Sequence, residues 1–357
     1  MRPGDLAPAG RLSGAHEPAD AGPTVYFLPT MSSRKRVGVV GVAGYGGGEI
    51  VRLCAAHPSV EVVYAAGESS AGQRLGDRYP GLGGALADLI IQAFDPQRLP
   101  DVDLLILSLP TGRSRTAVAA LPPELRVIDV GGDHRFVDGW TYGLTEVTGP
   151  ATIAESSRVA DPGCFPAAAL LALAPLIARG LIEPTGIIVD AKTGISGAGR
   201  GGGSTFGFAE VNEDVSAYNV FKHAHTPEMR EALSRMSGGA PASLVFSPHL
   251  VPMTRGILAT CYAHGRVATD AAFRTAREFY AEAAFVRVSD ALPHSRWAQG
   301  TNLAFVSYAA DPEAETVIAL GALDNLGKGA AGQAVQNMNL MLGFPEQLGL
   351  DLVPLLP

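Results

Sequence analysis

The stretch Val37-Gly-Val-Val-Gly-Val-Ala-Gly-Tyr-Gly-Gly-Gly-Glu-Ile-Val-Arg-Leu53 decides the fold class. It reads as an apolar strand, a glycine-rich turn and the start of a helix. This order is typical of a dinucleotide-binding domain, because glycines let the backbone approach a pyrophosphate at a helix N-terminus. The spacing G-x-x-G-x-G-G departs from the commoner G-x-G-x-x-G, so a purely structural glycine turn is the alternative interpretation.

Three further apolar runs continue the alternation of strands and helices. They cover residues 61–65, 103–107 and 126–130, with helical segments between them. Continuous apolar runs are typical of parallel strands that are covered on both faces. We therefore predict a Rossmann-type, doubly wound α/β domain with a parallel sheet over residues 34–162, completed by a C-terminal helix over 325–345.

The second half of the chain predicts a different kind of domain. Strand-like runs cover residues 186–190, 243–246, 257–262 and 316–320. Helical patterns cover residues 166–179, 227–236, 270–283 and 328–342. We predict an α+β domain over 163–324, with a mainly antiparallel sheet.

Both ends of the chain differ from these domains. Residues 1–33 are rich in Gly, Pro and Ala and show no hydrophobic periodicity. Such a segment cannot bury enough apolar surface to order itself, so we predict a disordered N-terminal extension. Residues 346–357 are predicted to form a C-terminal tail.

Composition excludes several classes of protein. The 357 residues carry a net charge of −8, which argues against a basic surface that binds nucleic acid. No apolar run reaches the roughly 18 residues that a membrane-spanning helix needs. The three cysteines have no metal-ligand spacing and predict no disulfide framework, which fits a reducing compartment. We expect a cytoplasmic protein with no nucleic-acid or membrane partner.

Cys164 lies in the segment Asp161-Pro-Gly-Cys-Phe-Pro166, directly before an alanine- and leucine-rich helical pattern. Proline is favoured in the first turn of a helix, which places Cys164 at the helix N-terminus. The macrodipole and the free N–H groups there stabilise a thiolate, so Cys164 is a candidate nucleophile. The alternative is a small apolar residue packed in a turn.

The segment His223-Ala-His-Thr-Pro-Glu228 offers the proton chemistry that a cysteine nucleophile needs. His225 precedes the start of a predicted helix, and Glu228 is expected to reach back and orient it. One alternative is that these are surface polar residues. Another is a zinc site that uses His223 and His225, for which the sequence shows no convincing third ligand.

Two polar segments are candidates for binding the anionic groups of a cofactor or substrate. The segment Gly67-Glu-Ser-Ser70 follows the second strand; an acid there suits the ribose 2′-hydroxyl of NAD, whereas hydroxyls suit the 2′-phosphate of NADP. The glycine-rich loop 193–204 carries Arg200, a candidate phosphate ligand. Arg255 stands beside a strand, as a partner for a substrate carboxylate or as a surface ion pair.

Together these segments closely resemble the N-acetyl-γ-glutamyl-phosphate reductase family of the semialdehyde dehydrogenase superfamily. The resemblance covers residues 36–350, with matching motifs at 161–166, 190–200, 223–228, 248–257 and 324–339. It implies NADPH-dependent reduction of N-acetyl-L-glutamyl 5-phosphate to the 5-semialdehyde, with phosphate release through a cysteine thioester, in arginine biosynthesis. It also implies a homotetramer or dimer.

The resemblance assigns roles to individual residues. Cys164 matches the nucleophile, His225 the acid/base, and Glu228 the residue that orients the histidine, with His223 beside them. The expected NADP(H) site comprises Gly41, Gly44, Tyr45, Gly46, Gly47, Ser69, Ser70, Ser108, Pro110, Ser196, Gly197 and Asn325. Arg135, Arg200 and Arg255 are expected to bind substrate, and no metal is expected.

Several departures keep alternatives open. The link between Arg135 and Trp140 is shorter than is usual in the family, Glu68 argues against strict NADP preference, and Ala224 replaces a frequent cation. The alternative substrate is a carrier-protein-bound aminoadipyl phosphate of lysine biosynthesis. A non-catalytic dinucleotide-binding protein is a second alternative. The apolar segment 316–322 is expected to supply an oligomer interface.

Overall fold

The computed structural model describes residues 34–200 and 207–355. The predicted extension 1–33, the residues Gly201–Ser204 of the glycine-rich loop and the last two residues of the tail lie outside the described residues. Within the described part, no helix is long and apolar enough to cross a membrane.

The first sheet has six strands, all in parallel register, in the order β2-β1-β3-β4-β6-β5. Its strands are β1 (Lys35–Val40), β2 (Val60–Ala66), β3 (Leu104–Leu107), β4 (Arg126–Asp129), β5 (Thr141–Tyr142) and β6 (Arg158–Ala160). The chain leaves β1 for β2 on one side and then returns to β3 on the other. The carboxyl ends of β1 and β3 therefore flank a topological switch point, where ligands bind in open α/β sheets.

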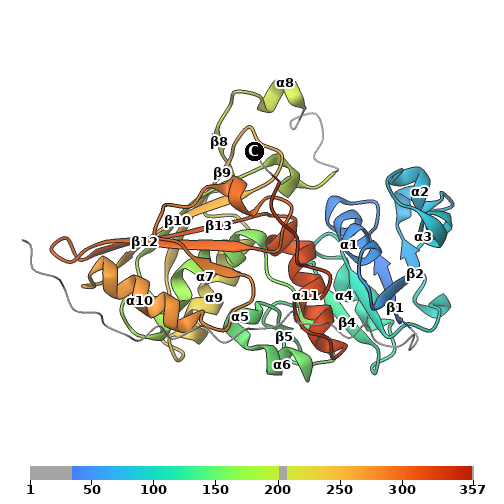
Figure 1. Ribbon diagram of the computed structural model, residues 1–357, viewed down its shortest axis with the longest axis horizontal. Helices are drawn as coiled ribbons and strands as arrows, with labels where there is room; N and C mark the ends of the chain where they lie inside the picture. Colours follow the sequence, from blue (N-terminus) through green and yellow to red (C-terminus); the bar gives the residue numbers. More distant parts are fainter. Residues whose placement is uncertain (1–33, 201–206, 356–357) are drawn as a thin grey trace, which may run out of the picture. The chain divides into compact units, whose positions relative to one another are not determined.

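Helices bury both faces of this sheet, which explains its continuous apolar strands. On one face, Val37 and Val39 share a core with helix α1 (Tyr45–Ala55) and helix α11 (Gly332–Met341). On the other face, Val40 and Leu107 pack with helix α4 (Ser114–Ala119). The predicted Rossmann-type sheet is confirmed (Figure 1).

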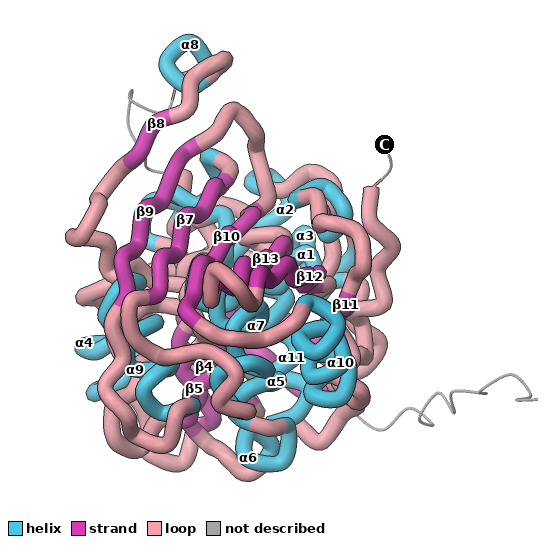
Figure 2. Tube along the Cα trace, turned by 90° about the vertical axis from the view of Figure 1, so that its left-hand side faces the viewer, coloured by secondary structure: helices cyan, strands magenta, loops and turns pink. Residues whose placement is uncertain are grey.

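The second sheet has seven strands in the order β11-β12-β13-β10-β7-β9-β8. They are β7 (Ile187–Thr193), β8 (Ser216–Ala217), β9 (Leu244–Leu250), β10 (Ile257–His264), β11 (Val286–Val288), β12 (Ala304–Asp311) and β13 (Thr316–Leu323). Only the β11–β12 and β7–β9 pairs are parallel, so the predicted mainly antiparallel sheet is confirmed. Figure 2 shows its central strands side by side.

One face of the second sheet is covered by α7 (Cys164–Ala178), α9 (His225–Met236) and α10 (Thr269–Phe279). Every residue of α7 from Phe165 to Ile177 is buried. A helix that is apolar on all sides belongs inside a protein, and α7 packs against α9, β10 and β13 at once. The position of Cys164, the first residue of α7, is thus fixed by the core of the second sheet.

The short helices are α2 (Leu75–Arg78), α3 (Gly84–Asp88), α5 (Thr145–Thr148), α6 (Pro150–Ala154) and α8 (Phe208–Val211). The predicted helix 328–342 is not one regular helix. It begins as a π-helical turn, η6 (Gly327–Ala331), and continues as α11. Glycine permits a close approach in η6, since a Cβ on Gly329 would lie 2.9 Å from Cβ of Cys164. π-turns of this kind are frequent at functional sites.

Candidate functional site

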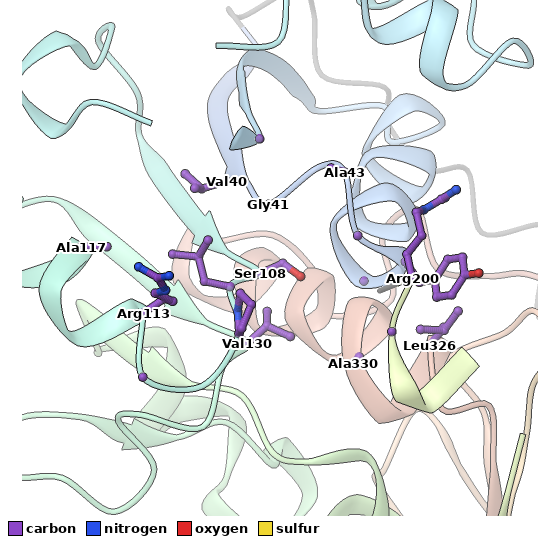
Figure 3. Close-up of a pocket in the computed structure, with 18 of the residues that line it drawn as sticks. Val40, Gly41, Ala43, Ser108, Arg113, Ala117, Val130, Arg200, Leu326 and Ala330 are labelled. Atoms are coloured by element: carbon purple, nitrogen blue, oxygen red, sulfur yellow. The ribbon is translucent and has the colours of Figure 1, made fainter. Parts of the chain in front are cut away.

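A cavity of about 1530 Å³ lies at the carboxyl ends of the first sheet. Its walls include Gly41 after β1, Gly67 after β2, Ser108 after β3, and Val130 after β4. The turn before α7, the 3₁₀ turn η3 (Ile195–Ala198) and η6 complete the lining. Figure 3 shows the cavity with Arg113 and Arg200 on opposite sides of it.

Most residues that the sequence assigned to a cofactor do line this cavity. They are Gly41, Gly44, Tyr45, Gly46, Ser69, Ser108, Pro110, Ser196, Gly197 and Asn325. The two others, Gly47 and Ser70, do not. Asn325 is held from both sides, because its Nδ2 donates to Oγ of Ser196 at 2.9 Å and its Oδ1 accepts from N of Gly256 at 2.8 Å.

The glycines of the turn allow close backbone contacts that a Cβ would block. Gly41 has a φ of 91°, and a Cβ on it would collide with the carbonyl of Ser108. A Cβ on Gly47 would collide with the carbonyl of Gly41, so Gly47 serves the packing of α1 on β1. Gly44 caps α1 without a side-chain hydrogen bond, which leaves first-turn N–H groups for an anion. The residues present therefore fit a dinucleotide.

The cavity lining also includes two arginines that the sequence did not single out, Arg78 and Arg113. Nη2 of Arg78 donates to the carbonyl of Ala43 in the glycine turn at 2.9 Å. Glu68 and Ser69 line the same cavity, and Oε1 of Glu68 accepts from N of Phe94 at 3.4 Å. Arg78 lies on α2, well beyond the end of β2, where an adenosine-binding residue is usually found. Its distance from that strand in the sequence therefore could not predict a role in binding the cofactor.

Cys164 lines the cavity and begins α7, with Gly163 as the N-cap. Burial raises the pKa of the Cys164 thiol to about 11, although the N–H of Phe165 and the charge of Arg135 act in the opposite direction. The helix N-terminus thus favours the thiolate, as predicted, but not enough to keep the sulfur ionised in the free protein. Desolvation outweighs the helix terminus, and a base must take the proton.

His225 is the first residue of α9 and lines the same cavity. Its Nε2 packs against Gly163, where a Cβ would lie only 2.5 Å away. Burial, then the charges of Arg135 and His223, lowers the pKa of His225 well below its ordinary value. A neutral imidazole, able to accept a proton, is thus placed beside the residue that precedes Cys164.

His223 supports His225 from outside the cavity. Nδ1 of His223 accepts a hydrogen bond from the backbone N of His225 at 3.1 Å, and its ring meets Phe165 edge-on. In the described part of the chain, no group of three His, Cys, Asp or Glu side chains could hold a metal.

Glu228 does not make the predicted hydrogen bond to His225. Its Oε2 accepts from Nη1 of Arg135 at 2.7 Å, and its Oε1 accepts from the hydroxyl of Tyr142 and the N of Gly163, both at 2.8 Å. Nδ1 of His225 has no hydrogen-bond partner among the described residues. The carboxylate accepts hydrogen bonds from these three donors and from neither nitrogen of His225. The predicted contact that orients His225 is therefore wrong.

Two of the three arginines expected to bind substrate are held by acids. Arg135 is paired with Glu228, and its Nε donates to the carbonyl of Asp161 at 2.8 Å. Arg255 forms ion pairs with Glu49 at 2.7 Å and Asp324 at 2.9 Å, and it does not line the cavity. Arg135 nevertheless lines the cavity. Both guanidiniums already pair with buried carboxylates, and their contact with substrate stays a prediction.

Arg200 differs from them. It lines the cavity, and its guanidinium lies over the ring of Tyr45 at 4.7 Å from the centroid. Such stacking leaves the edge of a guanidinium able to donate hydrogen bonds.

Comparison with known proteins places the chain among its relatives. Residues 36–156 match the family described as "Semialdehyde dehydrogenase, NAD binding domain", and residues 164–325 match "Semialdehyde dehydrogenase, dimerisation domain". The N-acetyl-gamma-glutamyl-phosphate reductase of Bradyrhizobium sp. (strain ORS 278) is 62% identical over 90% of this chain and 99% of its own. The protein of that name from Brevibacillus brevis is 41% identical over the same shares.

Among solved structures, the chain resembles aspartate semialdehyde dehydrogenase II of Vibrio cholerae, complexed with ASA. The TM-score is 0.68 at 19% identity, over 87% of this chain and 99% of that one, which shows a shared fold. The sequence identities of 41% to 62% to the relatives, over 99% of their length, show family membership as well as fold. The chain belongs to the N-acetyl-gamma-glutamyl-phosphate reductase family.

Proposed function

We propose that the protein reduces N-acetyl-L-glutamyl 5-phosphate to N-acetyl-L-glutamate 5-semialdehyde with NADPH, releasing phosphate, in arginine biosynthesis. The observation that carries the proposal is that Cys164 and His225 line the same cavity as the glycine turn. The candidate nucleophile, a neutral base and the proposed dinucleotide site therefore line one cavity. The printed names of relatives up to 62% identical support the substrate.

In the proposed reaction, Cys164 is the nucleophile and His225 is the base and acid. His225 takes the thiol proton while the sulfur of Cys164 attacks the acyl carbon. The carbon–oxygen bond to phosphate breaks, one solvent proton accompanies the phosphate, and an acyl thioester remains on Cys164. The glycine turn, Ser108 and Asn325 would hold a nicotinamide dinucleotide, which would supply the hydride for reduction of this thioester. His225 then protonates the oxyanion, and collapse of the thiohemiacetal releases the aldehyde and the thiol.

Arg200 is the proposed ligand of the acyl phosphate. It faces the cavity and stacks on Tyr45 at the start of α1, next to the glycine turn. A planar guanidinium binds phosphate oxygens in pairs, which suits a group that gains charge as it leaves. Arg135 and Arg255 are left out of this role because acids hold them.

A preference for NADP over NAD is proposed because of the position of Arg78. The glycine turn and the end of β2 meet where the adenosine ribose sits in this fold, and an arginine there accommodates the 2′-phosphate. Arg78 bonds Ala43 of that turn and lines the cavity with Ser69. Glu68 would repel the 2′-phosphate, but its carboxylate accepts from Phe94. An Arg78→Gln variant should raise KM for NADPH at least about tenfold and leave KM for NADH nearly unchanged.

Homo-oligomerisation is proposed through the face of the second sheet that the helices leave open. Ile188, Val245 and Tyr262 expose 44%, 38% and 37% of their surface on neighbouring strands there. The predicted interface segment 316–322 lies in β13, whose two edges are paired with β10 and β12. It can contribute only through side chains on that open face. Light scattering should report a dimer or tetramer, and an Ile188→Asp variant should reduce the mass.

A cytoplasmic location belongs to the same proposal, because a free thiol nucleophile needs a reducing compartment.

The proposal is tested by assaying the purified protein with the acyl phosphate, and in reverse with the semialdehyde, phosphate and NADP. Wild type should be active in both directions, and Cys164→Ser should lose activity while still binding nucleotide. Full activity in Cys164→Ser contradicts the mechanism. Reduction of a carrier-bound aminoadipyl phosphate in place of the free substrate contradicts the proposed substrate.

A further inference from the structure

We propose that Glu228 is a positioning residue: its carboxylate holds the Asp161–Gly163 turn against helix α9 and so keeps the Cys164 thiol beside His225. The inference rests on the proposed function, because it gives Cys164 and His225 their roles. It differs from the role that sequence resemblance suggested, in which Glu228 orients the imidazole itself.

The first observation is the saturation of the carboxylate. The Glu228 side chain is only 3% exposed, and three donors from distant parts of the chain converge on it: Arg135, Tyr142 and the backbone of Gly163. A buried carboxylate needs such partners, because an unpaired charge is costly away from water. None of these donors belongs to α9, so Glu228 ties α9 to other elements.

The second observation is where those bonds fall in the chain. The N–H of Gly163, which Glu228 accepts, belongs to the N-cap of α7, one residue before Cys164. Nε of Arg135 holds the carbonyl of Asp161 at 2.8 Å, while its Nη1 holds Glu228. The Glu228–Arg135 pair therefore grips both ends of the Asp161–Gly163 turn.

The third observation links the turn to the base. His225 and Glu228 lie on the first turn of α9, and Nε2 of His225 packs against the Cα of Gly163 with no room for a Cβ. The bond from Gly163 to Glu228 thus joins the N-terminus of α7 to the helix that carries the base. A proton can pass between thiol and imidazole only at hydrogen-bond reach, so a small displacement of this turn should slow the reaction.

The charges around the carboxylate of Glu228 affect the pH dependence of Cys164 reactivity. A purely structural role of Glu228 in packing would not change that pH dependence. Arg135, Tyr142 and Cys164 face Glu228, and His225, Asp161 and Asp129 face Arg135. Besides burial, the charge of Glu228 raises the pKa of the Cys164 thiol, while Arg135 lowers it. Removing the negative charge of Glu228 removes one influence that opposes Arg135 at the thiol.

The test compares Glu228→Gln and Glu228→Asp with Glu231→Gln, an exposed control on the same helix whose partner is Arg235. Steady-state kinetics give kcat and KM for the acyl phosphate. The pH dependence of iodoacetamide labelling, read by mass spectrometry of the Cys164 peptide, needs neither substrate nor nucleotide.

For Glu228→Gln we expect kcat to fall about 100-fold, the scale of an ångström-level misplacement, with KM little changed. Labelling of Cys164 should move to lower pH, because the opposing charge is gone. Glu228→Asp keeps the charge but withdraws it by one methylene, so kcat should fall while the labelling profile stays in place. Glu231→Gln should behave as wild type in both assays.

Wild-type kcat in either Glu228 variant overturns the inference. A loss of kcat in Glu228→Gln with an unmoved labelling profile also overturns it, because the carboxylate then acts on His225 and not on the turn before Cys164. Should Glu228→Gln fail to fold, the kcat of Glu228→Asp decides alone. If wild type does not reduce the acyl phosphate, the proposed function fails, and an unmoved labelling profile in Glu228→Gln still overturns the link between Glu228 and Cys164.

Discussion

Replacing Lys328 by Met should be among the most destabilising single changes in the protein. Lys328 lies in η6 with its side chain fully buried, and its Nζ contacts Oε1 of Glu146 and Oε1 of Gln336, both at 2.6 Å. Without the ammonium group, Glu146 keeps only Nε2 of Gln336 at 3.3 Å on Oε1. Its Oε2 has no hydrogen-bond partner among the described residues.

The expected magnitude follows from that arrangement. Removing one partner of a buried ion pair costs about 3–5 kcal/mol, because the other charge stays buried and unpaired. The upper part of this range applies here, since the side chain of Glu146 is only 3% exposed. The double variant Lys328→Met, Glu146→Met removes both charges and should recover most of the loss. Arg266→Met, which breaks an exposed pair with Glu315, should cost about 1 kcal/mol or less.

Urea unfolding followed by circular dichroism at pH 7 measures all of these variants. A loss below about 1 kcal/mol for Lys328→Met, or a double variant no more stable than the single one, would refute the argument from an unpaired buried charge.

Two further predictions concern the glycine turn and the thiol. Gly47→Ala should weaken dinucleotide binding and cost about 1–3 kcal/mol of stability, because its Cβ would collide with the carbonyl of Gly41. Gly81→Ala, whose Cβ would meet nothing within 4 Å, is the matched control, and fluorescence titration of NADPH reads both. Because burial raises the pKa of Cys164 to about 11, iodoacetamide labelling of the free protein should still rise with pH between 8 and 10, and a plateau below pH 8 would contradict this.

The architecture was largely readable from local patterns. Apolar runs predicted β1, β2, β3 and β4 of the first sheet, because parallel strands buried on both faces must be apolar throughout. The short strands β5 and β6 were missed, since two or three residues form no recognisable run. Strand β12 (Ala304–Asp311) was missed, since Ser307 is buried in it among the apolar residues and blurs the pattern. The π-turn at Gly327–Ala331 was also missed, because glycine spacing does not reveal which backbone comes close.

The site was predictable only in part, for a physical reason. Short motifs placed Cys164 and His225 at helix starts, and the fold brings both to one cavity. The partners of the arginines were not predictable, because the acids that hold them are distant in sequence. Glu49 lies 206 residues before Arg255, and Glu228 lies 93 residues after Arg135. Ion pairing of that kind depends on tertiary structure, and so does the desolvation that keeps the Cys164 thiol protonated.

The most direct test is mass spectrometry of the protein mixed with N-acetyl-L-glutamyl 5-phosphate in the absence of nucleotide. A covalent thioester mechanism predicts an N-acetylglutamyl adduct on the peptide that contains Cys164. The adduct should be removed by hydroxylamine and be absent in Cys164→Ser. An unmodified Cys164 in protein that is fully active on addition of NADPH, or an adduct on another residue, would contradict it.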